Sequence, residues 1–288
     1  MASIPSNAIC GVEIHYPIMR KTIRFTAASL FAGAMLAATA GAQTISIKGS
    51  DTLGAKLVPQ LKEAFVAKNP GVKFEIAAEG SSTAFPALAN GTAQIGMSSR
   101  KAKPEEITNA RAKGIKLNEV EACHDMIVVV VNKGNKLKSL TKDQVAKIFT
   151  GAVKDWSEVG GAPGPISIYT RNTSSGTYKD WQTLAMGGKD YAGSSQKLAG
   201  NEQIAEEVAK NQNGVGYVGL AYAKKSGLVD VTIDGVEPVA ANAKKYAYSR
   251  ACYNYVPENA DATTKSFIEF ATGAEGQKIA KSLGFVPN

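Results

Sequence analysis

The sequence predicts an α/β fold of two lobes, and three observations support this prediction. After residue 42, segments with the alternating apolar residues of strands take turns with segments of helical spacing. Met126–Val131 is an uninterrupted apolar run, as expected for a strand that is buried on both faces. No flexible linker or low-complexity tract divides the chain. Two lobes joined directly by strands therefore fit better than two tethered domains.

The first half of this region is predicted to form three strand–helix units. Asn69-Pro70-Gly71 and Asn90-Gly91 stop the first two helices, and Glu105 and Glu106 suit the first turn of the third. The expected strands are 44–47, 72–76 and 93–97, and the expected helices are 54–68, 83–89 and 104–113.

The second half continues the alternation. Thr141 can cap a helix that runs to Phe149, and the last helical region is broken near Gly273. The expected strands are 126–131, 166–169, 214–217, 229–233 and 246–256, and the further helices are 177–186, 204–210 and 262–283.

The composition is that of a folded globular protein. Of the 288 residues, 44% are hydrophobic and 20% are charged, which excludes a disordered chain. The formal net charge of +8 suits an anionic ligand, while an evenly charged surface that serves solubility is the alternative. No basic block is interleaved with aromatic residues, so we expect no nucleic-acid partner.

The N-terminal segment predicts export. Residues 1–18 carry no pattern and precede Met19, the expected start. Basic residues then lead into the apolar run Phe25–Ala40, and Ala40-Gly41-Ala42 has the small residues of a cleavage site. The apolar run is short for a spanning helix, which needs roughly 20 residues, so a membrane anchor is the alternative. We expect residues 1–42 to be a leader and secretory signal peptide that is removed.

Three strand-to-helix loops carry glycine and small hydroxyl residues: Gly49–Thr52, Gly80–Thr83 and Arg171–Thr177. The start of a helix offers free backbone N–H groups and the positive end of the dipole, and Ser and Thr hydroxyls add donors. Ordinary N-capping explains any one loop equally well. Three together, one with an arginine, predict convergence on a single oxyanion.

Motifs for catalysis and metal binding lack their partners. Ser98–Lys101 matches S-x-x-K without S-D-N or K-T-G. Gly214–Gly219 matches G-x-G-x-x-G but follows a helix pattern instead of a strand. His124 is the single histidine after residue 42, and no C-x-x-C is present. We therefore expect neither an enzyme nor a metal or other cofactor.

Two cysteines, Cys123 and Cys252, follow the predicted signal peptide. In an oxidising compartment they are candidates for one disulfide, provided that their strand-like segments are neighbours. Two separate buried thiols are the alternative.

The exported chain resembles, over essentially its whole length, the phosphate-binding proteins of high-affinity phosphate ABC transporters. The resemblance is carried by GSDTL, EGSSTAFPAL, GTAQIGMSSR, RNTSSGTY, GVGYVGLAYAK and FIEFATGAEGQKIAKSLGFVP. It implies a type II periplasmic binding protein fold, with two α/β lobes joined by hinge crossings near Cys123–Met126 and Tyr248–Cys252. Lobe I would comprise residues 43–126 and 247–288, and lobe II residues 127–246.

The resemblance also implies a ligand, inorganic phosphate, buried between the lobes. The residues that it assigns to phosphate are Thr52, Leu53, Ser81, Arg171, Ser175, Gly176 and Thr177. At one position the chain departs from the family, because Ser99 stands where well-characterised members have an aspartate. That aspartate accepts the proton of hydrogen phosphate and so rejects sulfate.

We expect Ser99 to remain in the site and Asp125 to replace the missing acceptor, with Asp51 and Glu79 as further candidates. A hinge salt bridge between Asp125 and Arg250 is the alternative, and a structural ion pair is expected for Arg100.

The function implied by the resemblance is that of a monomeric periplasmic receptor that closes around phosphate and delivers it to an ABC transporter membrane permease. Three alternatives stay open. They are a receptor for sulfate, molybdate or another oxyanion, an exported phosphate-ester hydrolase, and a sensor or scavenger without a permease.

Overall fold

The computed structural model describes residues 43–288 together with residues 13 and 15. Apart from residues 13 and 15, the predicted leader and signal peptide therefore lie outside the described residues. From Gln43 onward the chain belongs to one unit in which strands and helices alternate, so the predicted α/β class is confirmed.

The hydrophobic core is divided between two halves of this unit. One cluster of buried side chains lies between Met126 and Tyr248 in the sequence. Two other clusters combine residues from Ile45 to Cys123 with residues from Cys252 to Phe285. We use lobe II for the half around the first cluster and lobe I for the half around the other two. The residue boundaries expected for the lobes stay a prediction.

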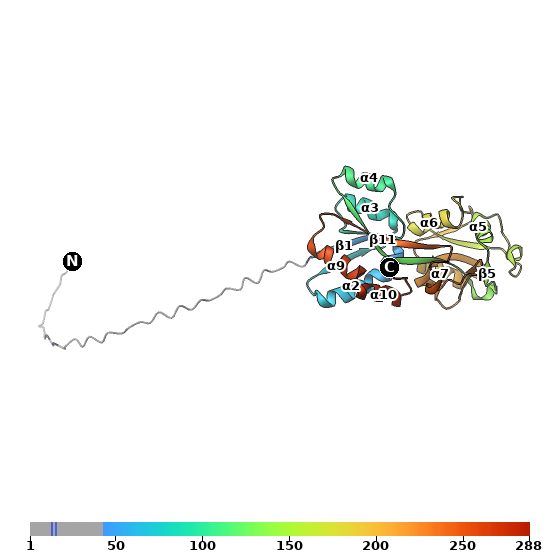
Figure 1. Cartoon of the computed structure of the whole chain (residues 1–288). Coiled ribbons are helices and arrows are strands. Elements are labelled where there is room, and N and C mark those ends of the chain that lie inside the picture. The colour runs from blue at the N-terminus through green and yellow to red at the C-terminus, as the bar shows by residue number, and fades with distance from the viewer. Residues whose placement is uncertain (1–12, 14, 16–42) are drawn as a thin grey trace, which may run out of the picture. The chain divides into compact units, whose positions relative to one another are not determined.

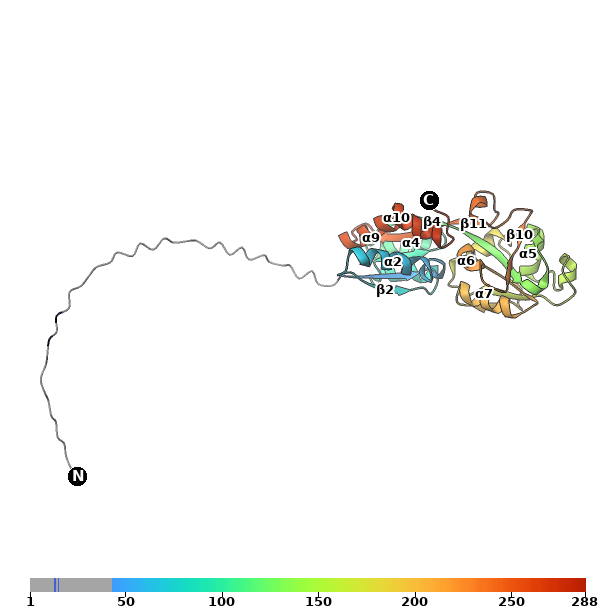
Figure 2. The same ribbon diagram turned by 90° about the horizontal axis from the view of Figure 1, so that it is seen from below.

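Lobe I is a sheet with helices on both faces. Its own strands are β1 (Thr44–Gly49), β2 (Lys73–Ala77) and β3 (Ile95–Ser98), and its helices are α1 (Asp51–Gly54), α2 (Leu57–Lys68), α3 (Ser81–Ala89), α4 (Pro104–Ala112), α9 (Ala262–Thr272) and α10 (Ala274–Ser282). Helices α3 and α4 cover one face of the sheet, and α2, α9 and α10 cover the other (Figures 1 and 2). Phe65 packs edge-on against Phe74 and Phe267, which fixes α2 between β2 and α9.

Lobe II has a similar layered build. Its own strands are β5 (Ser139–Leu140), β6 (Ser167–Arg171), β7 (Gln196–Leu198), β8 (Gly214–Gly219), β9 (Leu228–Asp230) and β10 (Thr232–Ile233), and its helices are α5 (Lys142–Thr150), α6 (Gly176–Leu184), α7 (Asn201–Lys210) and α8 (Leu220–Ala223). Trp181 stacks on Tyr217 with ring centroids 4.6 Å apart, which anchors α6 on β8. The predicted cap of α5 is confirmed, since Thr141 Oγ1 accepts from Gln144 N.

Two long strands run between the lobes, β4 (Leu117–Asn132) and β11 (Ser249–Pro257). The sheet order is β2-β1-β3-β11-β4-β8-β6-β7, with β9 also paired to β4. Strand β4 pairs with β11 up to Met126 and with β8 from Ile127 onward. Ser249, the first residue of β11, lies opposite Met126. The chain therefore passes between the lobes twice, side by side.

Some element boundaries differ from the predictions for identifiable reasons. The helix expected over 54–68 is two helices, α1 and α2. Helices α3 and α6 begin at Ser81 and Gly176, slightly earlier than expected, because the residues before them are the N-caps. The strand expected over 229–233 is divided, since β9 pairs with β4 and β10 with β5.

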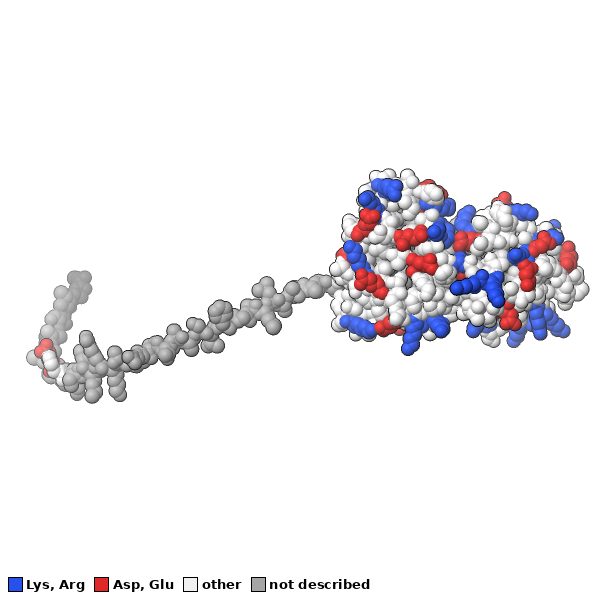
Figure 3. Space-filling model, viewed as in Figure 1, with Lys and Arg blue, Asp and Glu red and all other residues white. Residues whose placement is uncertain are grey.

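The charged side chains are spread over the surface. Lysine and arginine are interspersed with aspartate and glutamate on the face shown in Figure 3. This distribution supports the reading in which net charge serves solubility. Within residues 43–288, none of the helices has the length and apolar character that a membrane span requires.

Candidate anion-binding site

The three loops that were predicted to converge meet where the lobes touch. Thr52 Oγ1 of the first loop lies 3.1 Å from Thr177 Oγ1 of the third. Ser81 Oγ of the second loop lies 3.2 Å from Ser99 Oγ, which follows β3. A Cβ added to Gly176, at the start of α6, would lie only 2.3 Å from Ser81 Oγ. The hydroxyls of all three loops thus face one small volume between the lobes.

The predicted site residues are all buried. The exposed fraction is at most 1% for Thr52, Leu53, Ser81, Ser99, Asp125, Arg171, Ser175 and Thr177, and Gly176 is also buried. Buried hydroxyl and guanidinium groups need hydrogen-bond partners. An oxyanion, which accepts hydrogen bonds through several oxygens at once, matches such a set of donors.

A glycine brings the second and third loops into contact. Gly80 has φ +123°, in the left-handed region, and a Cβ there would lie 2.6 Å from the carbonyl oxygen of Ser174. That carbonyl accepts from Ser82 N at 3.1 Å, while Ser174 Oγ donates to the carbonyl of Glu79 at 2.8 Å. Only glycine permits this approach of the two backbones.

Ser175 is the N-cap of α6, and its Oγ accepts from Tyr178 N at 3.3 Å. This is the capping role that the loop was expected to allow. The N–H groups of Gly176 and Thr177 stand in the first turn, where a helix has no internal acceptor for them. They are free to serve a ligand from the same side as the hydroxyls.

Arg171 lies at the end of β6 and reaches across to lobe I. Its Nε and Nη2 both donate to the carbonyl of Ala199, at 3.1 and 2.8 Å. Its Nη1 lies 3.1 Å from Asp51 Oδ1, and Asp51 Oδ1 also accepts from Asn201 N at 3.0 Å. Burial lowers the pKa of Arg171, and the charge of Asp51 opposes that shift.

A second guanidinium, that of Arg250 on β11, stands beside the hydroxyls. Its Nη2 donates to Thr177 Oγ1 at 2.8 Å and to Asp125 Oδ2 at 3.0 Å. Its Nη1 donates to Asp180 Oδ2 at 3.2 Å. Although burial acts in the opposite direction, these carboxylates raise the pKa of Arg250 above its ordinary value.

Few of these neighbours of the site were predictable from the sequence. Arg250 is expected from the sequence only as a partner of Asp125, and Asp180 is not among the expected site residues. Asp180 follows Thr177 by three residues on α6, so it lies on the same face of that helix. This spacing was the one sequence pattern that pointed to Asp180. The hydroxyl of Tyr222 donates to the carbonyl of Thr52 at 2.9 Å, and no sequence pattern pointed to that residue.

Asp125 lies on β4 directly opposite Arg250. One carboxylate oxygen accepts from Arg250 Nη2, and the other accepts from Leu220 N at 3.3 Å. Asp125 was expected either to accept the ligand proton or to form a salt bridge with Arg250, and the salt bridge is present in the structure. Burial raises the pKa of Asp125, and Arg250 opposes this effect. A role of Asp125 in accepting a ligand proton stays a prediction.

Arg100, which follows Ser99, forms the expected ion pair. Its Nη1 and Nη2 donate to the two carboxylate oxygens of Glu106 at 2.8 and 2.6 Å. Glu79, a reserve candidate for the acceptor, has an exposed side chain, and it meets the third loop through its backbone carbonyl.

Comparison with known proteins shows the family to which this chain belongs. The family model described as "PBP superfamily domain" matches residues 36–275. "Phosphate-binding protein PstS" of Pseudomonas aeruginosa is 32% identical over 270 residues, which cover 84% of this chain and 82% of the relative. The chain belongs to the PstS-like proteins of the PBP superfamily.

Solved structures of PstS-like proteins agree with this assignment. One is described as a putative phosphate ABC transporter substrate-binding protein with bound phosphate, from Clostridium perfringens. It is 33% identical, covers 85% of this chain and 100% of its own, and has a TM-score of 0.79. An ABC-type phosphate transport receptor from Vibrio cholerae is 26% identical, with 85% and 100% coverage and a TM-score of 0.71. The periplasmic binding protein fold, implied by the resemblance, is confirmed.

The two cysteines of this PstS-like chain lie opposite each other on β4 and β11. The predicted neighbourhood of their strands is therefore confirmed, but Cys123 and Cys252 are free, buried thiols in the structure, so the disulfide is not formed there. A hydrogen bond with Cys252 and burial both raise the pKa of Cys123. Because the thiolate is the reactive form, this environment disfavours oxidation.

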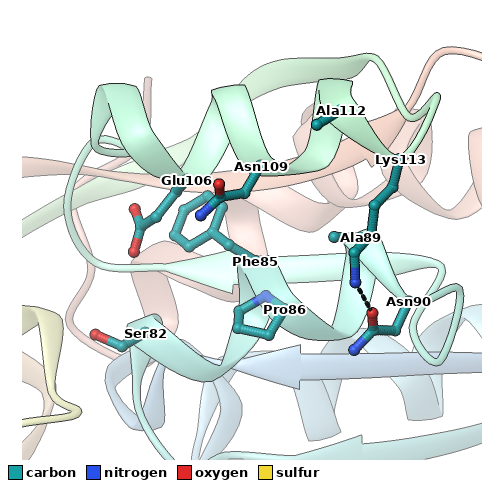
Figure 4. Close-up of a pocket in the computed structure, with 9 residues that line it drawn as sticks. All are labelled: Ser82, Phe85, Pro86, Ala89, Asn90, Glu106, Asn109, Ala112 and Lys113. Atoms are coloured by element: carbon teal, nitrogen blue, oxygen red, sulfur yellow. Dashed lines mark hydrogen bonds between the residues drawn. The ribbon is translucent and has the colours of Figure 1, made fainter.

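The remaining features lie apart from the site. A cavity of about 350 Å³ between α3 and α4 is lined mainly by apolar surface, including Phe85, Pro86 and Ala112 (Figure 4). None of the predicted site residues of this PstS-like protein lines it. Among the described residues, no group of histidine, cysteine or acidic side chains could hold a metal ion.

Proposed function

We propose that this protein is a periplasmic receptor that binds inorganic phosphate between its lobes and delivers it to the membrane permease of an ABC transporter. The observation that carries the proposal is the buried cluster of Thr52, Ser81 and Thr177 hydroxyls with the guanidinium groups of Arg171 and Arg250 beside it. The Pseudomonas relative, named for phosphate binding, and the Clostridium structure, described with bound phosphate, support the choice of ligand.

The strength of such a site can be estimated from its donors. Each charge-assisted hydrogen bond contributes about 1.5–3 kcal/mol net, and each helix start about 0.3–1 kcal/mol. A micromolar site needs roughly −8 kcal/mol. The hydroxyls, the N–H groups of α3 and α6 and the two arginines can therefore reach this affinity after the anion has lost its water.

Binding without chemical change is the activity that we propose. The curated relatives are named as binding proteins. The hydroxyls of the site are paired with each other, with backbone groups or with arginine. A nucleophilic serine or threonine needs a general base beside it, and these neighbours do not supply one. A soluble monomer in the periplasm fits this role.

One observation favours a second candidate, a receptor for oxyanions in general. Both oxygens of Asp125 are engaged by Arg250 and Leu220, and Ser99 stands where the family has its acceptor. With fewer acceptors for the proton of hydrogen phosphate, the site would discriminate less strongly against sulfate.

Titration calorimetry tests the proposal. Mature protein over residues 43–288, freed of phosphate, is titrated with phosphate, sulfate and molybdate at pH 7.5. Micromolar or tighter binding of phosphate supports the receptor. Equal binding of sulfate favours the second candidate, and binding of none refutes both. Turnover of p-nitrophenyl phosphate would instead support the hydrolase.

Two variants test whether phosphate binds at the proposed site. Arg171→Met removes a buried guanidinium and should weaken phosphate binding by at least about 2 kcal/mol, which is about 30-fold. Arg111→Met removes an exposed arginine of α4 and should leave the affinity unchanged. Equal effects of the two substitutions would contradict the proposed site.

A further inference from the structure

Lys56 belongs to lobe I, between α1 and α2, and its ammonium group lies against lobe II. Its Nζ is 2.8 Å from Glu202 Oε1 and donates to the carbonyl of Ala221 at 3.0 Å. It also lies over the ring of Tyr222, 4.3 Å from the centroid. A carboxylate, a carbonyl and an aromatic face all attract an ammonium group. The cation is therefore held by α7 and α8, which both belong to the opposite lobe.

This contact of Lys56 lies outside the candidate anion-binding site, because none of its three partners is among the residues assigned to the anion. Tyr222 connects the two places, since its hydroxyl donates to the carbonyls of Asp51 and Thr52 at 3.2 and 2.9 Å. The carboxylate of Asp51 in turn accepts from Asn201 N of α7 at 3.0 Å. Helix α1 and the lysine that follows it are thus bound to the first residues of α7 and to α8.

The ion pair between Lys56 and Glu202 can separate at small cost. The exposed fraction of the side chain is 31% for Lys56 and 44% for Glu202, so neither charge has lost most of its water. Glu202 also has a partner within its own lobe, because Lys225 Nζ lies 3.5 Å from its Oε2. When the lobes separate about β4 and β11, Glu202 keeps Lys225 as a partner and Lys56 enters water.

We infer that Lys56 is a latch, a residue that ties the lobes together only in the closed form and slows the release of phosphate without touching it. This inference rests on the proposed function. Since the three contacts of Lys56 are all with lobe II, opening breaks them together. A contact that exists in the closed form alone adds its free energy to ligand affinity. The gain falls on the dissociation rate, because phosphate enters before the lobes meet.

The test uses Lys56→Met in the protein over residues 43–288, because methionine keeps the aliphatic chain and removes the ammonium group. Loss of a partly exposed ion pair and a cation–π contact should weaken phosphate affinity about 3- to 10-fold, as measured by calorimetry. Release of radiolabelled phosphate into an excess of unlabelled phosphate gives the dissociation rate. That rate should rise by the same factor, with the association rate unchanged within about twofold.

Lys68 of α2 provides a matched control. Its Nζ pairs with Glu275 of α10 and lies 5.8 Å from the ring centroid of Phe270 on α9. These partners are also a carboxylate and an aromatic ring, but they belong to the same lobe as the lysine. Lys68→Met removes the same charge and no contact between the lobes, so its affinity and dissociation rate should match those of the parent chain.

Glu202→Gln separates the latch from the general attraction between a lysine and an anion. If charge alone mattered, removal of a negative charge would strengthen phosphate binding. Removal of the carboxylate that holds Lys56 should instead weaken binding by about two- to fivefold, with faster release. In the double variant the two losses should be less than additive, because both substitutions remove the same ion pair.

The outcomes also separate the latch from a structural role and from the proposed function. Without phosphate, Lys56→Met should unfold in urea at the same midpoint as the parent chain, since the open form lacks the contact. A loss of stability as large as the loss of affinity would overturn the latch. Parent-like affinity of both Lys56→Met and Glu202→Gln, or effects of opposite sign, would also overturn the latch alone. A parent chain that binds no phosphate refutes the proposed function and the latch together.

Discussion

Gly176 offers a direct test of how the lobes meet. It is the first residue of α6 in lobe II, and a Cβ at this position would lie 2.3 Å from Ser81 Oγ and 2.8 Å from Ser99 Oγ. Both serines belong to lobe I. The methyl group of alanine at position 176 would therefore overlap with lobe I and hold the lobes apart. Its steric effect inside lobe II is small, because the three nearest atoms all belong to lobe I.

The magnitude follows from the overlap. Forcing one methyl group into a filled space costs about 1–3 kcal/mol, which is about 5- to 150-fold in affinity. The free energy of unfolding without phosphate should not fall. The lobes can separate about β4 and β11, and alanine is a better helix former than glycine by about 0.5–1 kcal/mol.

The assay has two readouts, phosphate affinity by calorimetry and the radius of gyration by small-angle X-ray scattering with and without phosphate. Gly176→Ala should lose affinity and contract less on adding phosphate. Gly71→Ala is the matched control, because nothing lies within 4 Å of a Cβ at that glycine. A Gly176→Ala protein that binds and contracts like the parent would show that α6 does not press against Ser81 in the bound form.

Three further predictions concern stability, thiols and salt. Asp261 caps α9, since its Oδ1 accepts from Thr264 N at 2.8 Å, so Asp261→Ala should lower the free energy of unfolding in urea by about 1 kcal/mol and Asp261→Asn by less. Although burial acts the other way, hydrogen bonds from Thr264 lower the pKa of Asp261; its contribution should thus be complete above pH of about 4 and fade as pH falls through the lowered pKa. Unreduced protein over residues 43–288 should show two thiols to Ellman's reagent after denaturation and almost none before it, because Cys123 and Cys252 are buried. If no thiol appears until the protein is reduced, the two cysteines form the disulfide. Sodium chloride up to 0.5 M should weaken phosphate binding by less than about threefold, since buried contacts are screened little, and a steep loss would point to an exposed site.

Local patterns were enough to predict most of the fold. The continuous apolar run at Met126–Val131 became the lobe II part of β4, and all six of these side chains are fully buried. Thr141 and Asn69 mark helix ends where the sequence placed them. Residues 117–121 of β4 were not predicted, because their exposed or half-buried and partly charged side chains hide the strand, which exists through pairing with β11.

The site, like the fold, has residues that local sequence patterns predict and residues that they do not. Glycine and hydroxyl residues at helix starts are a local signal, so the loops of Thr52, Ser81 and Thr177 could be found in the sequence. Arg250 contacts Thr177 across 73 residues of sequence and Asp125 across 125. Such partners depend on strand register and on how the lobes meet, which no short pattern encodes.

The charges near the site imply that oriented donors, more than net charge, hold the anion. Two guanidinium groups, Arg171 and Arg250, are matched by three carboxylates, Asp51, Asp125 and Asp180. Arg250 and Asp125 face each other where β11 and β4 pass between the lobes, and Arg250 also holds Thr177 of lobe II, which meets Thr52 of lobe I. An anion that binds the two threonines therefore fixes the lobes at the crossing strands as well. Affinity and closure share the same contacts, so a substitution that weakens one should weaken the other.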